Sequence, residues 1–273
     1  QTIYKTMAPP TVKAKTLGYE LFGEVLGVAV LIILGDGTGA IASHMGETTF
    51  YVWLFIVAGW SLAVAAAIVI SFDISGAHLN SAVTLSLIIN DGFPLSKGLC
   101  FMAAQFVGAF LGALVLTLLY MAIQGSNHLP NFYCTAKLKE VPFVAMFFFE
   151  LVTTGSLVFV PKVVQQRRSA PMTRLQAGTL NGLIIAFLGF VSWWFKTFAL
   201  NPARDLGPRL CWLLFEIGFG RGALWSKVMG GGYFIIPIVA PFLGAPLAGL
   251  MFERFFSMGE AKGKQDIEAA SMI

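Results

Sequence analysis

The sequence predicts an all-α membrane protein with six transmembrane helices and two re-entrant half-helices, arranged as an inverted repeat. Three observations lead to this fold class: long uncharged apolar runs, basic residues that gather on one side of the predicted membrane, and a polar motif that occurs twice. The chain is 57% hydrophobic and only 12% charged, whereas soluble domains carry about 25% charged residues. A soluble fold of 273 residues could not bury so much apolar surface, so lipid must surround much of the chain.

The apolar runs have the length of membrane-spanning helices. Tyr51–Phe72 contains 22 residues without Asp, Glu, Lys or Arg, and Val228–Phe252 contains 25. A helix needs about 20 apolar residues to cross the hydrocarbon core of a bilayer. We therefore expect six spans, near residues 18–41, 51–72, 97–123, 142–164, 173–195 and 232–256.

The distribution of charge predicts the orientation of the chain. Six spans place both termini on the same side, and eleven of the 18 Lys and Arg residues fall on that side. Because basic loops stay in the cytoplasm, both termini are expected to be cytoplasmic. This explains the net charge of +4 without a nucleic-acid partner. We expect a cytoplasmic tail at 1–16, a channel domain at 17–256 and a second cytoplasmic tail at 257–273, in a multi-pass protein of the plasma or inner membrane.

The channel domain contains an internal repeat, over about 17–124 and 141–256. Gly76–Ala82 (GAHLNSA) is echoed by Phe198–Ala203 (FALNPA), each just after a span and just before an apolar stretch too short to cross. Three spans in each copy is an odd number, so the second copy enters the membrane upside down. Inverted repeats with interrupted segments point to a site at the bilayer midplane. Small residues at four-residue spacing, such as Gly108 and Gly112, favour close packing of the spans.

Asn80 and Asn201 are expected to cap two half-helices that meet inside the membrane. A helix N-terminus carries free N–H groups and about half a positive charge, and an Asn side-chain oxygen accepts from those groups. The Asn NH₂ group is then left as a donor. Two such ends, tip to tip, accommodate neutral hydroxyls or water and repel cations. Alternatively, each Asn is an ordinary cap in a buried turn.

The two motifs resemble the signature loops of the major intrinsic protein family, the aquaporins and glycerol facilitators. The matching segments are Ser75–Thr84 and Asn201–Arg209; with the paired Glu24 and Glu150, the resemblance covers about residues 17–256. The resemblance implies a homotetramer with one pore in each subunit and no cofactor. One departure is Ser81, where the family usually has Pro; loss of the preset turn puts the rigidity and the permeation rate in doubt.

The resemblance also implies which residues select the solute. The family's narrowest point falls on Trp60, Gly189, Phe198 and Arg204. The small Gly189, the apolar pair Trp60 and Phe198, and Asp205 directly after Arg204 resemble the glycerol-conducting members. Trp60 and Phe198 would cover the carbons of a polyol while Arg204 donates to its hydroxyls. The hydroxyls of the polyol would donate hydrogen bonds to backbone carbonyls along the two loops. These are the carbonyls of Gly76, Ala77, His78, Thr197, Phe198 and Ala199.

The acidic residues are expected to be structural. Carboxylates within a membrane often have a direct functional role. In the family, however, such glutamates accept hydrogen bonds from backbone N–H groups and hold the re-entrant loops. We prefer this scaffold role for Glu24 and Glu150 over proton relay. Asp205 is expected to bind loop backbone. Arg204 could instead face solvent or be tied to Asp205. His78 is expected to line the pore, with a packed histidine as the alternative.

We therefore predict a passive channel for glycerol and other small neutral polyols, with some water, that excludes ions and protons. The first alternative is a channel largely restricted to water. The second is a coupled secondary transporter, because inverted repeats also build those; only Glu24 and Glu150 could then serve as titrating groups. An enzyme is disfavoured, because the sequence shows no nucleophile–base pair, no metal-spaced cluster and no phosphate-binding loop.

Overall fold

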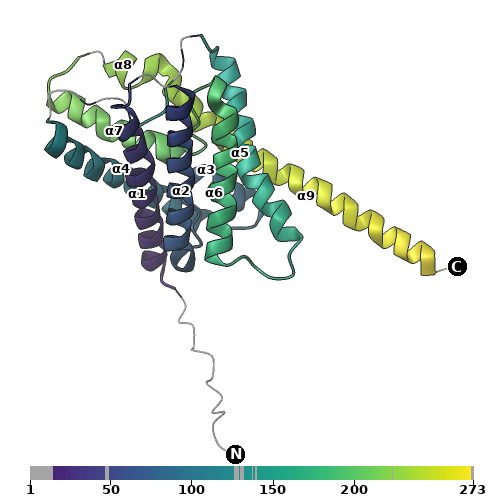
Figure 1. Cartoon of the computed structure of the whole chain (residues 1–273). Helices are drawn as coiled ribbons and strands as arrows, with labels where there is room; N and C mark the ends of the chain where they lie inside the picture. The colour runs from purple at the N-terminus through teal and green to yellow at the C-terminus, as the bar shows by residue number, and fades with distance from the viewer. Residues whose placement is uncertain are drawn as a thin grey trace, which may run out of the picture.

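The computed structural model describes residues 15–46, 49–125, 129, 132–136, 138, 140–222 and 224–271, with side chains up to 255. Of the expected terminal tails, 1–14 and 272–273 lie outside the described residues. The described part of the chain is helical and contains no strand (Figure 1). Its elements are α1 (Leu17–Ala42), α2 (Phe50–Ser75), α3 (Ser81–Asn90), α4 (Leu95–Gln124), α5 (Phe143–Gln166), α6 (Arg174–Val191), η1 (Ser192–Trp194), α7 (Pro202–Gly218), α8 (Leu224–Lys227), η2 (Gly230–Ile235) and α9 (Ile236–Ser271).

Six segments are long and apolar enough to cross a membrane, as the sequence predicts. They are α1, α2, α4, α5, α6 with η1, and the segment from α8 into α9. Large apolar side chains on their outer faces stay exposed, for example Leu62 at 71% and Phe187 at 67%. Exposed side chains of this kind are stable against lipid tails and unstable against water. Helix α9 continues away from the bundle to Ser271 (Figure 1), so helical backbone extends beyond residue 256, where the sequence predicts the channel domain to end.

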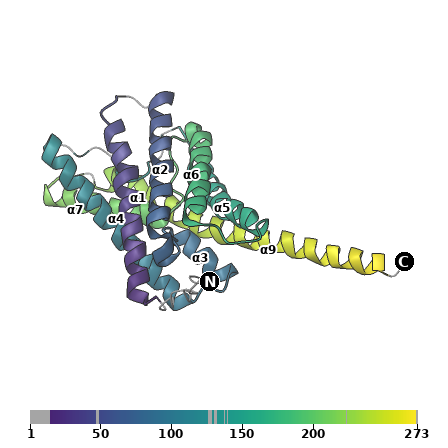
Figure 2. The same cartoon turned by 60° about the horizontal axis from the view of Figure 1, so that its bottom comes forward.

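The half-helices exchange partners between the two repeats. Helix α3 of the first repeat packs against α9 of the second, and α7 of the second repeat packs against α4 of the first. Figure 2 shows α3 next to α9 and α7 next to α4 from a second direction. Each repeat therefore completes the core of the other, which brings the N-terminal ends of α3 and α7 into the interior of the bundle.

Glycines allow the close approach of helices that the sequence predicts. A Cβ added at Gly108 would lie 2.5 Å from the carbonyl oxygen of Val25, and one at Gly112 would lie 2.7 Å from that of Ala29. In the second repeat, a Cβ at Gly244 would overlap the carbonyl oxygen of Leu151. Backbones can meet at this distance only where one residue lacks a side chain, which is how helices pack in lipid.

Candidate functional site

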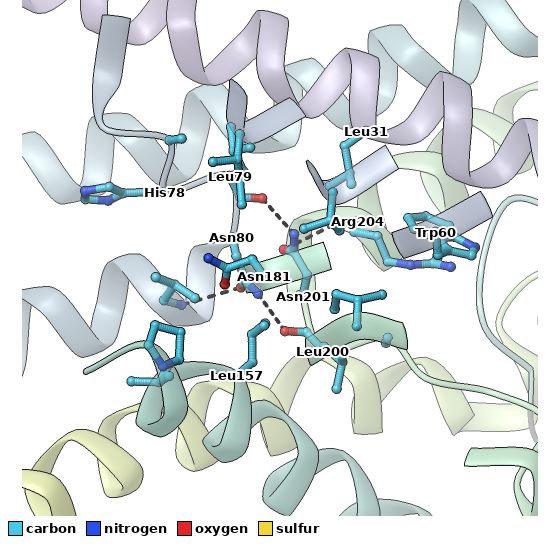
Figure 3. A pocket seen from close by; sticks show the side chains of 18 of the residues that line it. Leu31, Trp60, His78, Leu79, Asn80, Leu157, Asn181, Leu200, Asn201 and Arg204 are labelled. Atoms are coloured by element: carbon cyan, nitrogen blue, oxygen red, sulfur yellow. Dashed lines mark hydrogen bonds between the residues drawn. The ribbon is translucent and has the colours of Figure 1, made fainter. Parts of the chain in front are cut away.

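The two half-helices begin at the two asparagines and meet there. The side-chain oxygen of Asn80 accepts from the N–H of Ala82 at 2.9 Å, and that of Asn201 accepts from the N–H of Ala203 at 3.0 Å. The Asn80 Nδ2 donates to the carbonyl of Leu200, and the Asn201 Nδ2 donates to the carbonyl of Leu79, both at 2.7 Å (Figure 3). Each amide uses one of its two N–H groups on the opposite loop, so one donor per amide remains.

Left-handed backbone turns bring the loop carbonyls to this junction. Leu79 has φ 52° and Leu200 has φ 58°, and Ala77 in the first loop has φ 55°. Non-glycine residues in this region are strained, at a cost of about 1–3 kcal/mol each. Surrounding contacts must therefore hold the two loops in place.

Glu24 and Glu150 make those contacts, and both are fully buried. The Glu24 carboxylate accepts from the N–H of His78 at 3.0 Å and of Leu79 at 2.8 Å. The Glu150 carboxylate accepts from the N–H of Ala199 at 2.7 Å and of Leu200 at 2.9 Å. Carboxylates bonded to backbone N–H groups are strong acceptors, so each glutamate fixes the loop that precedes one asparagine.

A polar network takes the place of the proline ring that the first motif lacks. The hydroxyl of Ser81, fully buried, donates to Gln105 Oε1 at 2.9 Å. Gln105 Nε2 donates to Glu24 at 2.7 Å and to Thr84 Oγ1 at 3.0 Å. Ser81 is thus joined to the carboxylate that holds its own loop. Gln105 is not among the residues predicted from the sequence; a buried amide within an apolar span is the signal that could have identified it.

A cavity of about 250 Å³ follows the junction of the half-helices. Its lining includes several of the residues predicted for the pore: Trp60, Ala77, His78, Asn80, Phe198, Ala199, Asn201 and Arg204. Figure 3 shows the two asparagines at its centre, with Arg204 and Trp60 together to one side and His78 to the other. The predicted residues Gly76, Gly189 and Thr197 do not line this cavity. The polar Asn181, which was not predicted, does line it.

Three of the four predicted filter residues, Trp60, Phe198 and Arg204, line this cavity. The Arg204 guanidinium lies 4.0 Å from the centroid of the Trp60 ring (Figure 3), a stacking distance. Trp60, Phe198 and Arg204 are 6%, 6% and 8% exposed, so each keeps a small accessible edge. Gly189 lies directly behind Phe198, because a Cβ added there would be 3.2 Å from Phe198 Cζ. Because Gly189 has no side chain, nothing at this position displaces the ring of Phe198.

Arg204 is not tied to Asp205. The Asp205 carboxylate accepts from the N–H of Thr135 at 2.9 Å and from the guanidinium of Arg209 at 2.7 and 2.9 Å. Arg209 also donates to the carbonyls of Thr135 and Val228. These contacts agree with the expected role of Asp205 in binding loop backbone. The ion-pair partner of Arg204 among the described residues is Asp36 of α1, with Nη2 3.8 Å from Oδ1.

His78 both lines the cavity and packs in the core. Its Nδ1 lies 3.2 Å from Thr84 Oγ1, and its ring contacts Phe93 and Phe101 at centroid distances of 4.7 and 5.0 Å. The two interpretations of His78 from the sequence therefore describe one arrangement. The described residues hold no group of three or more His, Cys, Asp or Glu side chains able to bind a metal ion.

A buried acid anchors the end of α7. Glu216 accepts from Lys227 at 2.6 Å, from Arg221 at 3.2 Å and from Trp212 Nε1 at 3.2 Å. Burial raises the pKa of this carboxyl, but the hydrogen bonds and charges of Lys227 and Arg221 outweigh burial and hold its pKa below the ordinary value of 4.5. The C-terminal end of the second half-helix is thereby fixed to the chain that follows it.

Opposed half-helices that meet at two amides, inside a bundle of six membrane-length helices, define a channel-type, multi-pass membrane protein. The family model for major intrinsic proteins matches residues 11–252. The chain belongs to the major intrinsic protein family, which confirms the resemblance seen in its two motifs.

The relatives match most of the chain. It is 34% identical to "Aquaglyceroporin-2" of Rhizophagus irregularis, over 88% of this chain and 78% of that protein. It is 34% identical to the "Glycerol uptake facilitator protein" of Streptococcus pneumoniae strain R6, over 86% of this chain and 99% of that protein. The crystal structure of the aquaglyceroporin from Plasmodium falciparum is similar in fold, with a TM-score of 0.75 and 33% identity, over 87% of this chain and 96% of that one.

Proposed function

We propose that the protein is a passive channel for glycerol and other small neutral polyols, with some water, and that it excludes ions and protons. The observation that carries this proposal is the junction of Asn80 and Asn201, whose amides reach the same cavity from opposite half-helices. Relatives named as an aquaglyceroporin and a glycerol uptake facilitator support the choice of solute. Flux is downhill, without a cofactor and without a chemical step.

The cavity wall matches the two edges of a polyol. Trp60 and Phe198 offer aromatic surface to the carbon edge, and Arg204 and the two free amide N–H groups offer donors to the hydroxyl oxygens. Carbonyls of Ala77, His78, Phe198 and Ala199 are the proposed acceptors; Gly76 and Thr197 would extend this series beyond the cavity. Stripping a hydroxyl of water without replacement costs about 2–7 kcal/mol, so continuous replacement of hydrogen bonds keeps the barrier low.

The same geometry disfavours ions. Two helix N-termini present partial positive charge to the junction, which repels cations, and the aromatic wall offers nothing to replace the water shell of an ion. Glu24 and Glu150 are already used by the loop N–H groups. This supports a scaffold role for both and disfavours the coupled transporter.

Reconstitution into proteoliposomes tests the function directly. Stopped-flow light scattering under a glycerol gradient is expected to show glycerol entry well above that of protein-free vesicles, with water flow under a sucrose gradient also raised. We expect glycerol entry to rise linearly with glycerol concentration and to be unaffected by sodium and proton gradients. High water flow with background glycerol entry would establish the water-channel alternative; saturating entry that collapses with an ion gradient would establish the transporter.

We propose that the subunits form a homotetramer, as the family resemblance implies, and that both termini are cytoplasmic, as the distribution of basic residues implies. Native mass spectrometry of the detergent-solubilised protein should give four copies, and a dimer or monomer would refute it. Labelling a single cysteine placed at residue 18 in intact cells tests the orientation: protection from an impermeant reagent is expected, and labelling would place that end outside.

A further inference from the structure

A buried carboxylate lies behind the proposed filter and has no hydrogen-bond partner. Asp36 of α1 is 1% exposed, and neither of its carboxylate oxygens has a partner within the part of the chain that the structure describes. Burying an uncompensated charge is costly, so an acid retained at such a place needs a reason. Asp36 does not line the cavity, which excludes direct contact with a solute there.

The charge nearest to Asp36 is that of Arg204. Its Nη2 lies 3.8 Å from Asp36 Oδ1, too long for a hydrogen bond and short enough for strong attraction, because two charges interact strongly at this separation away from water. Arg204 Nη1 is likewise buried without a partner among the described residues. The guanidinium is therefore held by Trp60 stacking on one side and by the charge of Asp36.

Two features of the sequence build this arrangement. Gly35 lets the Trp60 ring rest on α1, because a Cβ added at Gly35 would lie 2.5 Å from that ring. The next residue in the same helix is Asp36. The other acid nearby, Asp205, is already neutralised by Arg209 at 2.7 Å. The two buried arginines and two buried aspartates therefore form two pairs. Arg209 pairs with Asp205, and Arg204 pairs with Asp36.

We propose that Asp36 is a positioning residue of the filter, which holds the Arg204 side chain back against Trp60 and α1 and balances its charge. This rests on the proposed function. Without the carboxylate, the guanidinium would seek water in the lumen, because a buried cation without a counter-charge is unstable. It would then narrow the passage for a polyol more than for water. Without Arg204, in turn, the Asp36 charge would stand uncompensated beside the passage and attract cations.

The test is a set of variants measured in proteoliposomes: Asp36→Asn, Arg204→Ala and the double variant. Asp36→Asn keeps the shape of the side chain and removes only its charge. Asp73→Asn is the matched control, because it is the same change in neighbouring α2 at a side chain 63% exposed, paired with Arg174 at 2.9 Å, where an ion pair contributes little. The glycerol-to-water permeability ratio and proton entry, followed with a trapped pH dye, are the two measurements.

Asp36→Asn is expected to lower the glycerol-to-water permeability ratio about threefold or more. This is less than the change that complete loss of a charge interaction at this separation would allow. Asp73→Asn is expected to leave the ratio unchanged. In the Arg204→Ala background, Asp36→Asn is expected to leave the ratio unchanged. Arg204→Ala alone is expected to admit protons, and the double variant to exclude them again. A purely packing role would not move proton entry in this way.

The proposal is overturned if Asp36→Asn keeps the wild-type ratio, or if it lowers the ratio equally with and without Arg204. Arg204→Ala leaves a buried acid unpaired and could fail to fold; recovery of folded protein by the double variant is then the expected result, and equally poor recovery refutes the pairing. If the wild type conducts water and no glycerol, the proposed function fails, and proton entry in the same variants still decides whether Asp36 acts through Arg204.

Discussion

Gly189→His is the change that most directly tests the width of the proposed filter. A Cβ at this position would lie 2.8 Å from Val57 Cγ1 and 3.2 Å from Phe198 Cζ. Both contacts are tighter than ordinary van der Waals distance, so we expect the added imidazole to displace Phe198 into the cavity that it lines or to enter the cavity itself. Either movement takes space from the solute.

The expected loss of glycerol flux in Gly189→His follows from the cost of forcing side chains apart, which is about 1–3 kcal/mol for an overfilled site. If a glycerol molecule must supply this energy at the filter, its flux falls about 5-fold to 150-fold, since about 1.4 kcal/mol corresponds to a tenfold change in rate. A water molecule is smaller and needs less displacement, so water flux should fall by a factor of about three or less.

Stopped-flow measurement of both fluxes on the same vesicles checks this. Gly218→His is the matched control, because a Cβ at Gly218 meets nothing within 4 Å, and it should leave both fluxes unchanged. Gly189→Ala, with a smaller added volume, should give an intermediate loss of glycerol flux. Equal loss of water and glycerol in Gly189→His, or no loss of either, would refute the reasoning.

Three further predictions concern the scaffold. Ser81→Pro should keep the glycerol-to-water ratio within about twofold of wild type, because it removes the bond from Ser81 to Gln105 and leaves the Asn80 cap on the N–H of Ala82 in place; a clearly altered solute preference in the stopped-flow assay would contradict this. Glu150→Gln should lower the stability of the solubilised protein by about 1–3 kcal/mol, because the amide cannot accept from both loop N–H groups with its two ends; circular dichroism on heating measures it, and an unchanged melting temperature would exclude the scaffold role. Glu216→Gln should lower the melting temperature at pH 7. Because the pKa of Glu216 is depressed, its stabilisation is fully present above pH 4.5 and is lost as the pH falls through the folded-state pKa, so the difference from wild type should shrink on acidification; a constant difference would refute the ion-pair origin.

The sequence determined the parts of this protein that depend on local chemistry. Apolar length identified the six spans, including the first and fourth, which carry the carboxylates Glu24 and Glu150. An asparagine before a short apolar stretch identified each half-helix start. The repeat then paired Glu24 with Glu150, because each lies at a matching place in its copy. These features need only neighbours along the chain or a comparison of the chain with itself.

Tertiary structure alone decided which polar groups meet across the bundle. Asn80 bonds to the carbonyl of Leu200, 120 residues away, and Asp36 finds Arg204 rather than a partner in its own helix. The spans are apolar on all sides, so their sequences do not reveal which face turns inward. The contacts of a polar residue on such a helix therefore depend on how the helix is rotated in the bundle. The packing of the spans against one another and against the two half-helices sets that rotation, and with it the wall of the cavity.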